Sequence, residues 1–416
     1  NQYQLQQQVL FNGILNWLTY GVHLGTEKNF FTVHIDDVFL DDQRWSMANN
    51  CTSGDDCPVT VDEPTILMTP ADVDYLLAWQ NNNGIKLDMV FNGGGYTAAA
   101  ALGPFPLGDK LLQNRTQLRW LNHTTDHLYL GCVQDFSVMP WRCATGSDGA
   151  ILWTSYQEVY DQIRNNQVFA QQKGLTIVSG ELVTGEHSGL RRAPQEPSDN
   201  PNLARALTNA GITMIGSDNS RETTQRVIGS ARTSPRYPMN IYYNTGKKIE
   251  AVDEYNWVYT SAANGGSGIC ENNATSTCIT PLDVSTGFDS YIVPLEARFM
   301  LLHTVSNSPR SHYAHQSNLA EDRILYPVLD KTLASYKNLF ATNTPVVNAT
   351  LTQLGAEMKN QTDWQTGRSR ITAYVQSGQL KVTLSSGTAA TLTPVTLPTG
   401  STGGSVSAYG GYLTGW

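Results

Sequence analysis

Strand-like and helix-like segments alternate along this chain, and that alternation limits its fold more than any other feature. Through the first three quarters of its 416 residues, short β-branched or aromatic runs are each followed by a segment with apolar residues at helical spacing. Such units predict a parallel sheet or a βα barrel, because a helix has to return the chain to the start of the next parallel strand. We expect strands at 30–35, 87–91, 118–121, 175–178, 212–215 and 312–316, and helices at 70–79, 156–169, 202–210, 295–305 and 324–340.

The two ends of the chain depart from this alternation. Apolar residues at helical spacing predict a helix over 5–18 that is already under way where the sequence opens. The possibility that the natural protein extends upstream, for example with a carbohydrate-binding domain, stays open. Near the other end, 370–375 and 380–384 alternate around a Ser-Gly turn, and Thr, Ser and Gly dominate thereafter. We therefore expect a main domain over 1–365 and a small β appendage over 366–416.

Composition narrows the range of partners. The chain has 27 Lys and Arg against 36 Asp and Glu, a net charge of −9 that opposes binding to a nucleic-acid backbone. No apolar run reaches the roughly 18 residues of a membrane-spanning helix. The low content of Lys and Arg, together with many Asn, Gln, Ser, Thr and Tyr residues, is typical of an extracellular surface.

The cysteines form three pairs of near neighbours in the sequence: Cys51 with Cys57, Cys132 with Cys143, and Cys270 with Cys278. This spacing favours three short-range disulfides in a secreted protein, and the alternative is six reduced cysteines in a cytosolic one. Because short loops gain less from cross-linking than long ones, we expect the bridges to fix insertions rather than the core. Six Asn-x-Ser/Thr sequons also permit glycosylation, although several are expected by chance.

Acidic residues stand where the first expected strand ends, which is where βα folds carry functional groups. The strand at 30–35 leads into Asp36 and Asp37. Neighbouring side chains of a strand point in opposite directions, but a bend at its end lets both reach one cleft. One carboxylate can then bind a metal while the other acts as a base. Taken alone, an Asp-Asp pair is more often a turn or a helix start.

Histidines stand at a second strand end. The strand at 118–121 leads into His123, and His127 follows four residues later. Two histidines at this spacing lie on one helical face or one turn and can share a metal, for which a carboxylate is the usual complement. Taken alone, such a pair is more often two surface histidines.

Together, the hydrophobic-Asp-Asp end at 33–37 and the His-Thr-x-x-His sequence at 123–127 resemble the polysaccharide deacetylases of the NodB type, which are carbohydrate esterases. The resemblance implies a distorted (β/α)7 barrel, of the α/β class, over roughly residues 25 to 340, so that 1–365 would be a metal-dependent catalytic domain. It implies that Asp36 is the catalytic base. The ligands that it implies for a divalent metal, expected to be zinc, are Asp37, His123 and His127.

An arginine and a further aspartate complete part of the family pattern. An Arg that precedes a Pro would pair with the base and hold down its pKa, and here either Arg191 or Arg192 precedes Pro194. Asp218 follows the strand at 212–215 and would contact substrate, although the Trp that the family carries downstream is absent.

A histidine at the end of a late strand would be the general acid. His315 lies nearest the end of the strand at 312–316 and is the first candidate, with His312 as the second. His303 falls within an apolar helical pattern, which favours a helix-face or core position instead.

Two long additions separate this chain from compact family members. One follows Asp37 and contains Cys51 and Cys57, and the other covers 221–282, where we expect an insertion. Both resemble the larger secreted branch that deacetylates galactosaminogalactan. The resemblance therefore implies an N-acetylated hexosamine exopolysaccharide as substrate, with GalNAc or GlcNAc units, and an amino-sugar polymer and acetate as products.

Sugar rings are commonly bound against aromatic side chains, and we expect Tyr96 and Trp120 to contact substrate. The protein is expected to be a secreted monomer. A first alternative is a glycoside hydrolase on a βα barrel, with Asp36 and either Glu181 or Glu186 as its paired carboxylates. A second is a secreted glycan-binding protein without catalytic activity.

Overall fold

The computed structural model describes residues 4–138, 140–273, 276–385 and 392–416. The chain forms two compact units, each discontinuous in sequence. The barrel unit comprises 32–297 and 311–331, and the terminal unit comprises 1–31, 298–310 and 332–416. The expected division between 365 and 366 stays a prediction; the barrel unit comprises two stretches of the chain and the terminal unit three.

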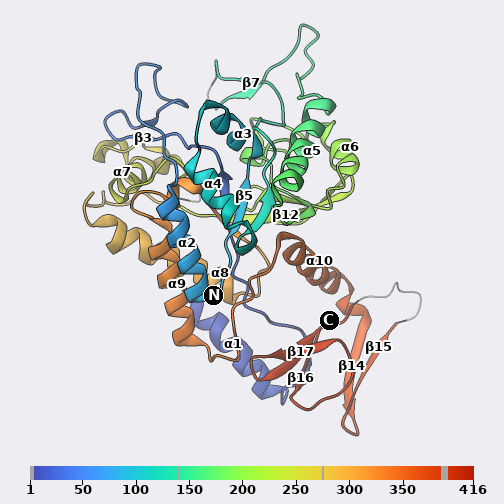
Figure 1. Ribbon diagram of the computed structural model, residues 1–416. Helices are drawn as coiled ribbons and strands as arrows, with labels where there is room; N and C mark the ends of the chain where they lie inside the picture. The colour runs from blue at the N-terminus through green and yellow to red at the C-terminus, as the bar shows by residue number, and fades with distance from the viewer. Residues whose placement is uncertain (1–3, 139, 274–275, 386–391) are drawn as a thin grey trace. The chain divides into compact units, whose positions relative to one another are not determined.

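A closed barrel of parallel strands forms the centre of the barrel unit (Figure 1). Its seven strands, counted over the described residues and given in ring order, are β2 (Val33–Val38), β5 (Asp88–Phe91), β6 (Arg119–Asn122), β9 (Ile177–Leu182), β10 (Met214–Asp218), β12 (Ala231–Pro238) and β13 (His312–His315). The parallel pairing of β10 with β12 and of β13 with β2 closes the ring. The predicted (β/α)7 barrel is thus confirmed.

Helices connect the strands and lie outside them (Figure 1). Those of the barrel unit are α2 (Pro70–Asn83), α3 (Gly93–Leu102), α4 (Pro106–Gln113), α5 (Tyr156–Lys173), α6 (Leu203–Asn209) and α7 (Lys248–Tyr259). Leu182 of β9 and Ile215 of β10 share one buried cluster with Ile163 of α5 and Leu207 of α6. Each fully buried aliphatic side chain of this kind stabilises the fold by about 1.5–3 kcal/mol relative to exposure.

Local sequence signals set the ends of α2. Thr69 and Asp72 form a capping box at its start, where Pro70 occupies the first helical position. Gly84 ends the helix with φ at 65°, in the left-handed region that glycine adopts without strain. A capping box and a left-handed glycine likewise bound α5. These signals explain why both helices were predictable from sequence.

The strand β12 lies within 221–282, so the expectation that this whole segment is an insertion is wrong. Its sequence is polar and includes Pro235, which lowers its strand propensity and conceals it. Nevertheless β12 pairs in parallel with β10 and with β13, and β11 (Val227–Ile228) pairs with it in antiparallel fashion. The six strands expected from sequence therefore lacked the seventh member of the ring.

Disulfides lie in the connections of the barrel unit. All six cysteines fall among the described residues and are paired as expected: Cys51–Cys57, Cys132–Cys143 and Cys270–Cys278. Two of the bridges adjoin short antiparallel pairs, formed by β3 (Trp45–Ser46) with β4 (Cys51–Thr52) and by β7 (Gln134–Asp135) with β8 (Arg142–Cys143).

The terminal unit contains α1 (Leu5–Leu18), α10 (Leu351–Gly367) and parts of α8 (Val293–Val305) and α9 (Leu325–Leu339). Its antiparallel sheet has the order β1 (His23–Leu24), β16 (Val395–Pro398), β18 (Tyr412–Gly415) and β17 (Val406–Tyr409). The expected hairpin is also present, as β14 (Ile371–Gln376) and β15 (Gln379–Leu384). Its turn places Ser377 and Gly378 at positive φ, as a two-residue type I′ hairpin requires.

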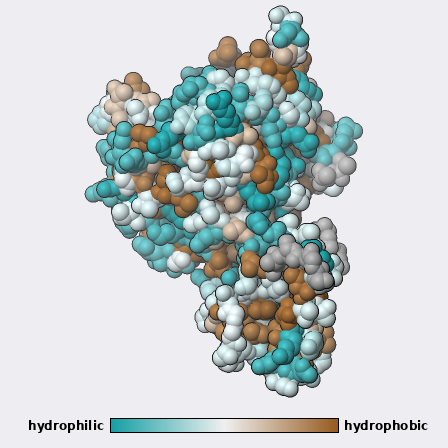
Figure 2. Space-filling model, turned by 90° about the vertical axis from the view of Figure 1, so that its right-hand side faces the viewer, coloured by the Kyte–Doolittle hydropathy of each residue, from teal (hydrophilic) through white to brown (hydrophobic). Residues whose placement is uncertain are grey.

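Among the described helices, none combines the length and the apolar character that crossing a bilayer requires. Figure 2 shows one face of the molecule, on which hydrophilic residues surround separate apolar patches.

Candidate active site

A β-bulge presents the two aspartates at the carboxyl end of β2. The register of β2 against β5 shifts between Ile35 and Val38, and Asp37 has a φ of 65°. A bulge of this kind re-aims side chains, so both Asp36 and Asp37 can serve one site although they are adjacent in sequence. Left-handed backbone at a non-glycine residue is held only where the surroundings enforce it.

The histidines lie on a loop after β6 rather than on a helix. Thr124 and His127 have φ values of 69° and 57°, which are incompatible with a helix. The buried Asn92 side chain donates to the carbonyl oxygens of His123 and Thr124, at 2.8 and 3.0 Å. Asn122 accepts from the Thr124 backbone N–H at 2.9 Å. These bonds hold the loop in the conformation that directs both imidazoles to the same point.

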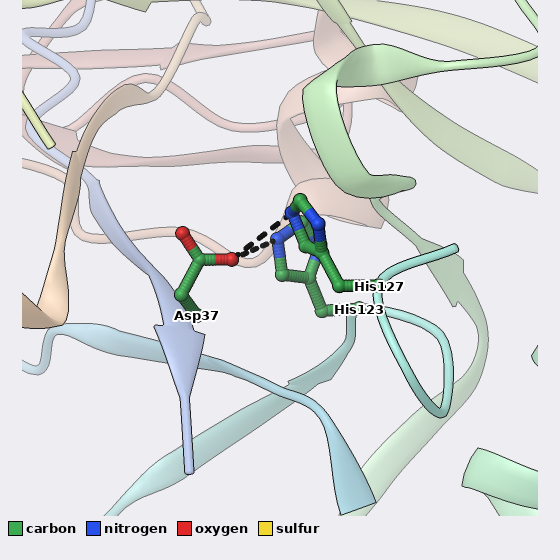
Figure 3. Close-up of side chains that lie close together, drawn as sticks. All are labelled: Asp37, His123 and His127. Atoms are coloured by element: carbon green, nitrogen blue, oxygen red, sulfur yellow. Dashed lines mark hydrogen bonds and ion pairs between the residues drawn. The ribbon is translucent and has the colours of Figure 1, made fainter. Parts of the chain in front are cut away.

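Asp37, His123 and His127 form a compact group of potential metal ligands (Figure 3). Oδ1 of Asp37 lies 3.1 Å from Nε2 of His123 and also 3.1 Å from Nε2 of His127. A further close group among the described residues, Cys51, Asp56 and Cys57, includes a disulfide, so its sulfur atoms are not available as thiolate ligands.

The chemistry of these three side chains fits a cation. Nδ1 of His123 lies 3.0 Å from the Val183 carbonyl oxygen, and with its hydrogen on Nδ1 the ring donates there and directs Nε2 at Asp37. Nε2 faces the Asp37 carboxylate, and either a proton on Nε2 or a cation between the two atoms satisfies both at this distance. Burial lowers the pKa of His127, but the Asp37 charge outweighs it and raises that pKa to about 9. Two imidazoles and one carboxylate are a donor set that suits zinc.

Asp36 pairs with Arg236 and not with Arg191 or Arg192, which corrects the expected partner. Nη1 and Nη2 of Arg236 each donate to one Asp36 oxygen at 2.9 Å. Burial would raise the pKa of Asp36, yet the charge of Arg236 holds it well below its usual range. Arg192 instead pairs with Glu186 at 3.0 Å.

Arg191 is exposed, and its backbone N–H donates to Asp199 at 2.8 Å. Arg191 and Arg192 thus have other partners, and the pairing with Asp36 that was expected of one of them is made by Arg236 instead. The sequence signal that could have revealed Arg236 is indirect: a ring of seven strands needs one more strand between 215 and 312, and Arg236 is the basic residue near its carboxyl end.

His187 and Tyr313 hold the Arg236 guanidinium from its other sides. Nε2 of His187 lies 2.7 Å from Nη2 of Arg236, and the Tyr313 ring lies 4.3 Å from its central carbon. Burial, followed by the charge of Arg236, lowers the pKa of His187 well below its usual range. The neutral His187 ring can therefore accept from Arg236, a contact that was not expected from sequence.

His315 ends β13 and lies opposite Asp36 in the register with β2. Its Nε2 is 3.9 Å from Oδ2 of Asp37, and burial lowers its pKa. His312 lies at the other end of β13, where its ring packs against Tyr237. The geometry thus separates the two candidates for the general acid. His303 lies on α8, as the helical pattern predicted.

The expected substrate contacts have different surroundings. Trp120 is 1% exposed, stacks on Phe39 and donates from its indole to the Arg115 carbonyl oxygen, so its ring belongs to the core and cannot be a sugar platform. Tyr96 is partly buried and contacts the same Phe39 ring. Asp218 ends β10 beside Arg236 of β12, at the same end of the barrel as the site.

The structure also shows the positions of the carboxylates that the alternative glycoside-hydrolase hypothesis would use. Glu181 of β9 is buried, and Glu186 is in the ion pair described above. Each oxygen of Asp36 accepts one hydrogen bond from Arg236.

The fold of this chain is similar to that of one solved carbohydrate deacetylase. The crystal structure of Agd3, described as a novel carbohydrate deacetylase, is similar with a TM-score of 0.69 and 16% identity, over 99% of this chain and 66% of that one. This chain thus spans just under two thirds of the Agd3 chain. No family model and no curated protein sequence matches it.

Two further deacetylase structures show weaker similarity. A polysaccharide deacetylase from Mycobacterium smegmatis has a TM-score of 0.40 and 11% identity, over 82% of this chain and 94% of that one. The chitin deacetylase of Colletotrichum lindemuthianum has a TM-score of 0.31 and 8% identity, over 76% and 84%. These scores are too low to define a shared fold by themselves.

Proposed function

We propose that this chain is a metal-dependent N-deacetylase of an N-acetylhexosamine polysaccharide, with GalNAc or GlcNAc units. The observation that carries the proposal is the position of Oδ1 of Asp37, at 3.1 Å from Nε2 of both His123 and His127. A second carboxylate, Asp36, and a third histidine, His315, adjoin this group. The deacetylase fold of the barrel supports the same reaction class.

Asp37, His123 and His127 would hold the metal, for which zinc is the proposed ion. When bound, a divalent ion supplies Lewis-acid chemistry that polarises a water molecule and the acetamide carbonyl group. The bulge in β2 and the hydrogen bonds of Asn92 keep the three ligands in place. Because these ligands are already held in place, less conformational entropy is lost when the ion binds.

Asp36 acts as the general base. Its carboxylate takes one proton from the attacking water, whose oxygen forms the new bond to the acetamide carbon. The Arg236 pair keeps Asp36 ionised and fixes its orientation. Because Arg236 occupies a side of each Asp36 oxygen, the proton has to be accepted through a remaining lone pair.

His315 acts as the general acid. Its protonated ring gives a proton to the nitrogen of the leaving amino sugar as the C–N bond breaks, so that acetate and a free amine result. Asp37, 3.9 Å away, favours the protonated form, whereas burial opposes it. Asp218, at the same end of the barrel, is proposed to contact sugar hydroxyl groups.

The disulfides support a secreted enzyme, because such bonds persist in oxidising compartments. We propose that it acts outside the cell, as a monomer, on a polymer rather than on single sugars.

Acetate release tests the proposal. The protein is incubated with N-acetylated GalNAc and GlcNAc polymers, and acetate, free amines and new reducing ends are measured. We expect acetate and amines in equal amounts, without new reducing ends, and no release by Asp37→Ala. New reducing ends without acetate would replace the proposal with glycoside hydrolysis. Polymer binding without any product would leave a glycan-binding protein.

A further inference from the structure

We propose a second carbohydrate-binding site in the terminal unit, separate from the metal centre. A cavity of about 530 Å³ lies there. Small-molecule sites have volumes of roughly 300–1,000 Å³ and combine aromatic walls with a few polar groups. The lining residues on which the argument rests are Trp364, Trp416, Gln361, Gln365, Asn307 and Arg310.

Two tryptophans give the cavity its aromatic wall. Trp364 lies on α10 and Trp416 follows β18, and both are partly exposed rather than buried. Nε1 of Trp416 donates to Oε2 of Glu357 at 2.8 Å, which fixes the edge of the indole. A fixed and partly exposed indole offers an apolar face at small entropic cost, and the C–H face of a sugar ring is a matching surface.

Amide side chains supply the polar part of the cavity. Gln361 and Gln365 lie four residues apart on α10 and therefore on the same face of the helix. Nε2 of Gln361 donates to the Asn307 carbonyl oxygen at 3.0 Å and contacts Glu357 at 3.3 Å, so its orientation is set. Gln365 is exposed. Amides of this kind suit hydroxyl and acetamido groups, which both donate and accept.

The charge of the lining selects between substrate and product. Arg310 lines the cavity, and the adjoining Glu357 carboxylate is already engaged, since its two oxygens accept from Trp416 and Gln361. A deacetylated polymer carries ammonium groups, which Arg310 repels, whereas an N-acetylated polymer is neutral. We infer that the site prefers the N-acetylated chain, so that the enzyme would hold its substrate and release its product. This choice of ligand rests on the proposed function.

Calorimetric titration tests the site. The full chain with Asp37→Ala, which would leave the substrate intact, is titrated with tetramers of N-acetylglucosamine and N-acetylgalactosamine and with their deacetylated forms. We expect adding Trp364→Ala to weaken binding of an acetylated tetramer at least tenfold, and Trp364→Tyr to restore most of it. Trp17→Ala, at a residue 77% exposed on α1 of the same unit, is the matched control and should leave binding unchanged.

Folding and catalysis are checked separately. Gln365→Ala alters an exposed side chain and should weaken binding severalfold without shifting the thermal unfolding midpoint. Three results would overturn the proposal. They are equal affinities of Trp364→Ala and Trp17→Ala, no binding by any variant, and tighter binding of deacetylated tetramers. Acetate release from a small soluble N-acetyl substrate by Trp364→Ala, with Asp37 restored, should be unchanged. Binding through Trp364 in a protein that releases no acetate would refute the proposed function and leave this site standing.

Discussion

Arg236 and Asp36 form a bidentate ion pair inside the barrel, with both oxygen–nitrogen distances at 2.9 Å and side-chain exposures of 1% and 4%. The two residues are 200 positions apart in the chain, on strands that do not pair with each other. A buried pair of this kind is costly to break, because the remaining charge is left without a partner or solvent. The ion pair therefore fixes the ionisation of the proposed base.

Removal of the Arg236 charge should harm both stability and catalysis. Arg236→Met leaves Asp36 buried without its partner, so we expect the free energy of unfolding to fall by about 3–5 kcal/mol. We also expect kcat/KM for acetate release to fall at least ~100-fold, because the base becomes protonated. Urea unfolding and steady-state kinetics measure the two effects. Arg191→Ala is the control, and an equal loss of activity there would show that Arg236 is not the partner that matters.

Substitution of His315 should separate proton donation from metal binding. In His315→Ala we expect kcat to fall by roughly 10²–10⁴, the range of general acid–base catalysis, while the metal content stays that of the unaltered protein. His312→Asn, three residues earlier on β13, should retain activity within about tenfold, because its ring packs against Tyr237 away from Asp37. Greater loss in His312→Asn than in His315→Ala would reverse the assignment.

Metal removal should abolish activity reversibly. After dialysis against a chelator we expect no acetate release, and one equivalent of zinc should restore it, because three protein ligands leave room for water on the ion. In His123→Ala, zinc should fail to restore activity. Full activity in protein shown by elemental analysis to be free of metal would contradict the proposed chemistry.

Glu254 of α7 gives a test of pH-dependent stability away from the site. Burial, with a smaller contribution from Asp56, raises the pKa of Glu254 to about 8, although Asn244 donates to it at 3.1 Å. The folded state therefore retains this proton over the window from the ordinary pKa near 4.5 up to about 8. Its contribution to stability is full below that window and is lost as the pH rises through it.

We expect the difference in unfolding free energy between Glu254→Gln and the unaltered protein to grow in favour of the variant as the pH rises. Between about pH 5 and about pH 8 this change should be on the order of a few kcal/mol. Urea titrations at several pH values measure it. A difference that stays constant across the window would show that Glu254 is not protonated in the folded state.

The metal ligands could be predicted from sequence because each group of residues is local. Asp36 and Asp37 adjoin a β-rich run, and His123 and His127 are four residues apart after another, so short motifs carried the hypothesis. What brings the groups together is the parallel register of β2, β5 and β6, which the alternation of strands and helices already implied. The bulge that turns Asp37 was not visible, since no glycine or proline marks it.

Arg236 could not be identified in this way. Its strand is polar and contains Pro235, so the strand lacks the apolar alternation by which its neighbours were found. The prediction that Trp120 contacts substrate was wrong for a different reason. The strand pattern of 118–121 was right, but whether a ring on it faces the core or a cleft depends on what covers that face, and here Phe39 does.

Anomalous scattering from zinc-loaded crystals shows whether Asp37, His123 and His127 bind the metal. We predict one strong peak within bonding distance of Oδ1 of Asp37 and of Nε2 of both His123 and His127, which is lost in His123→Ala. A zinc-loaded, active crystal whose peak lies elsewhere, with these three side chains bonded only to one another, would rule out the proposed metal site.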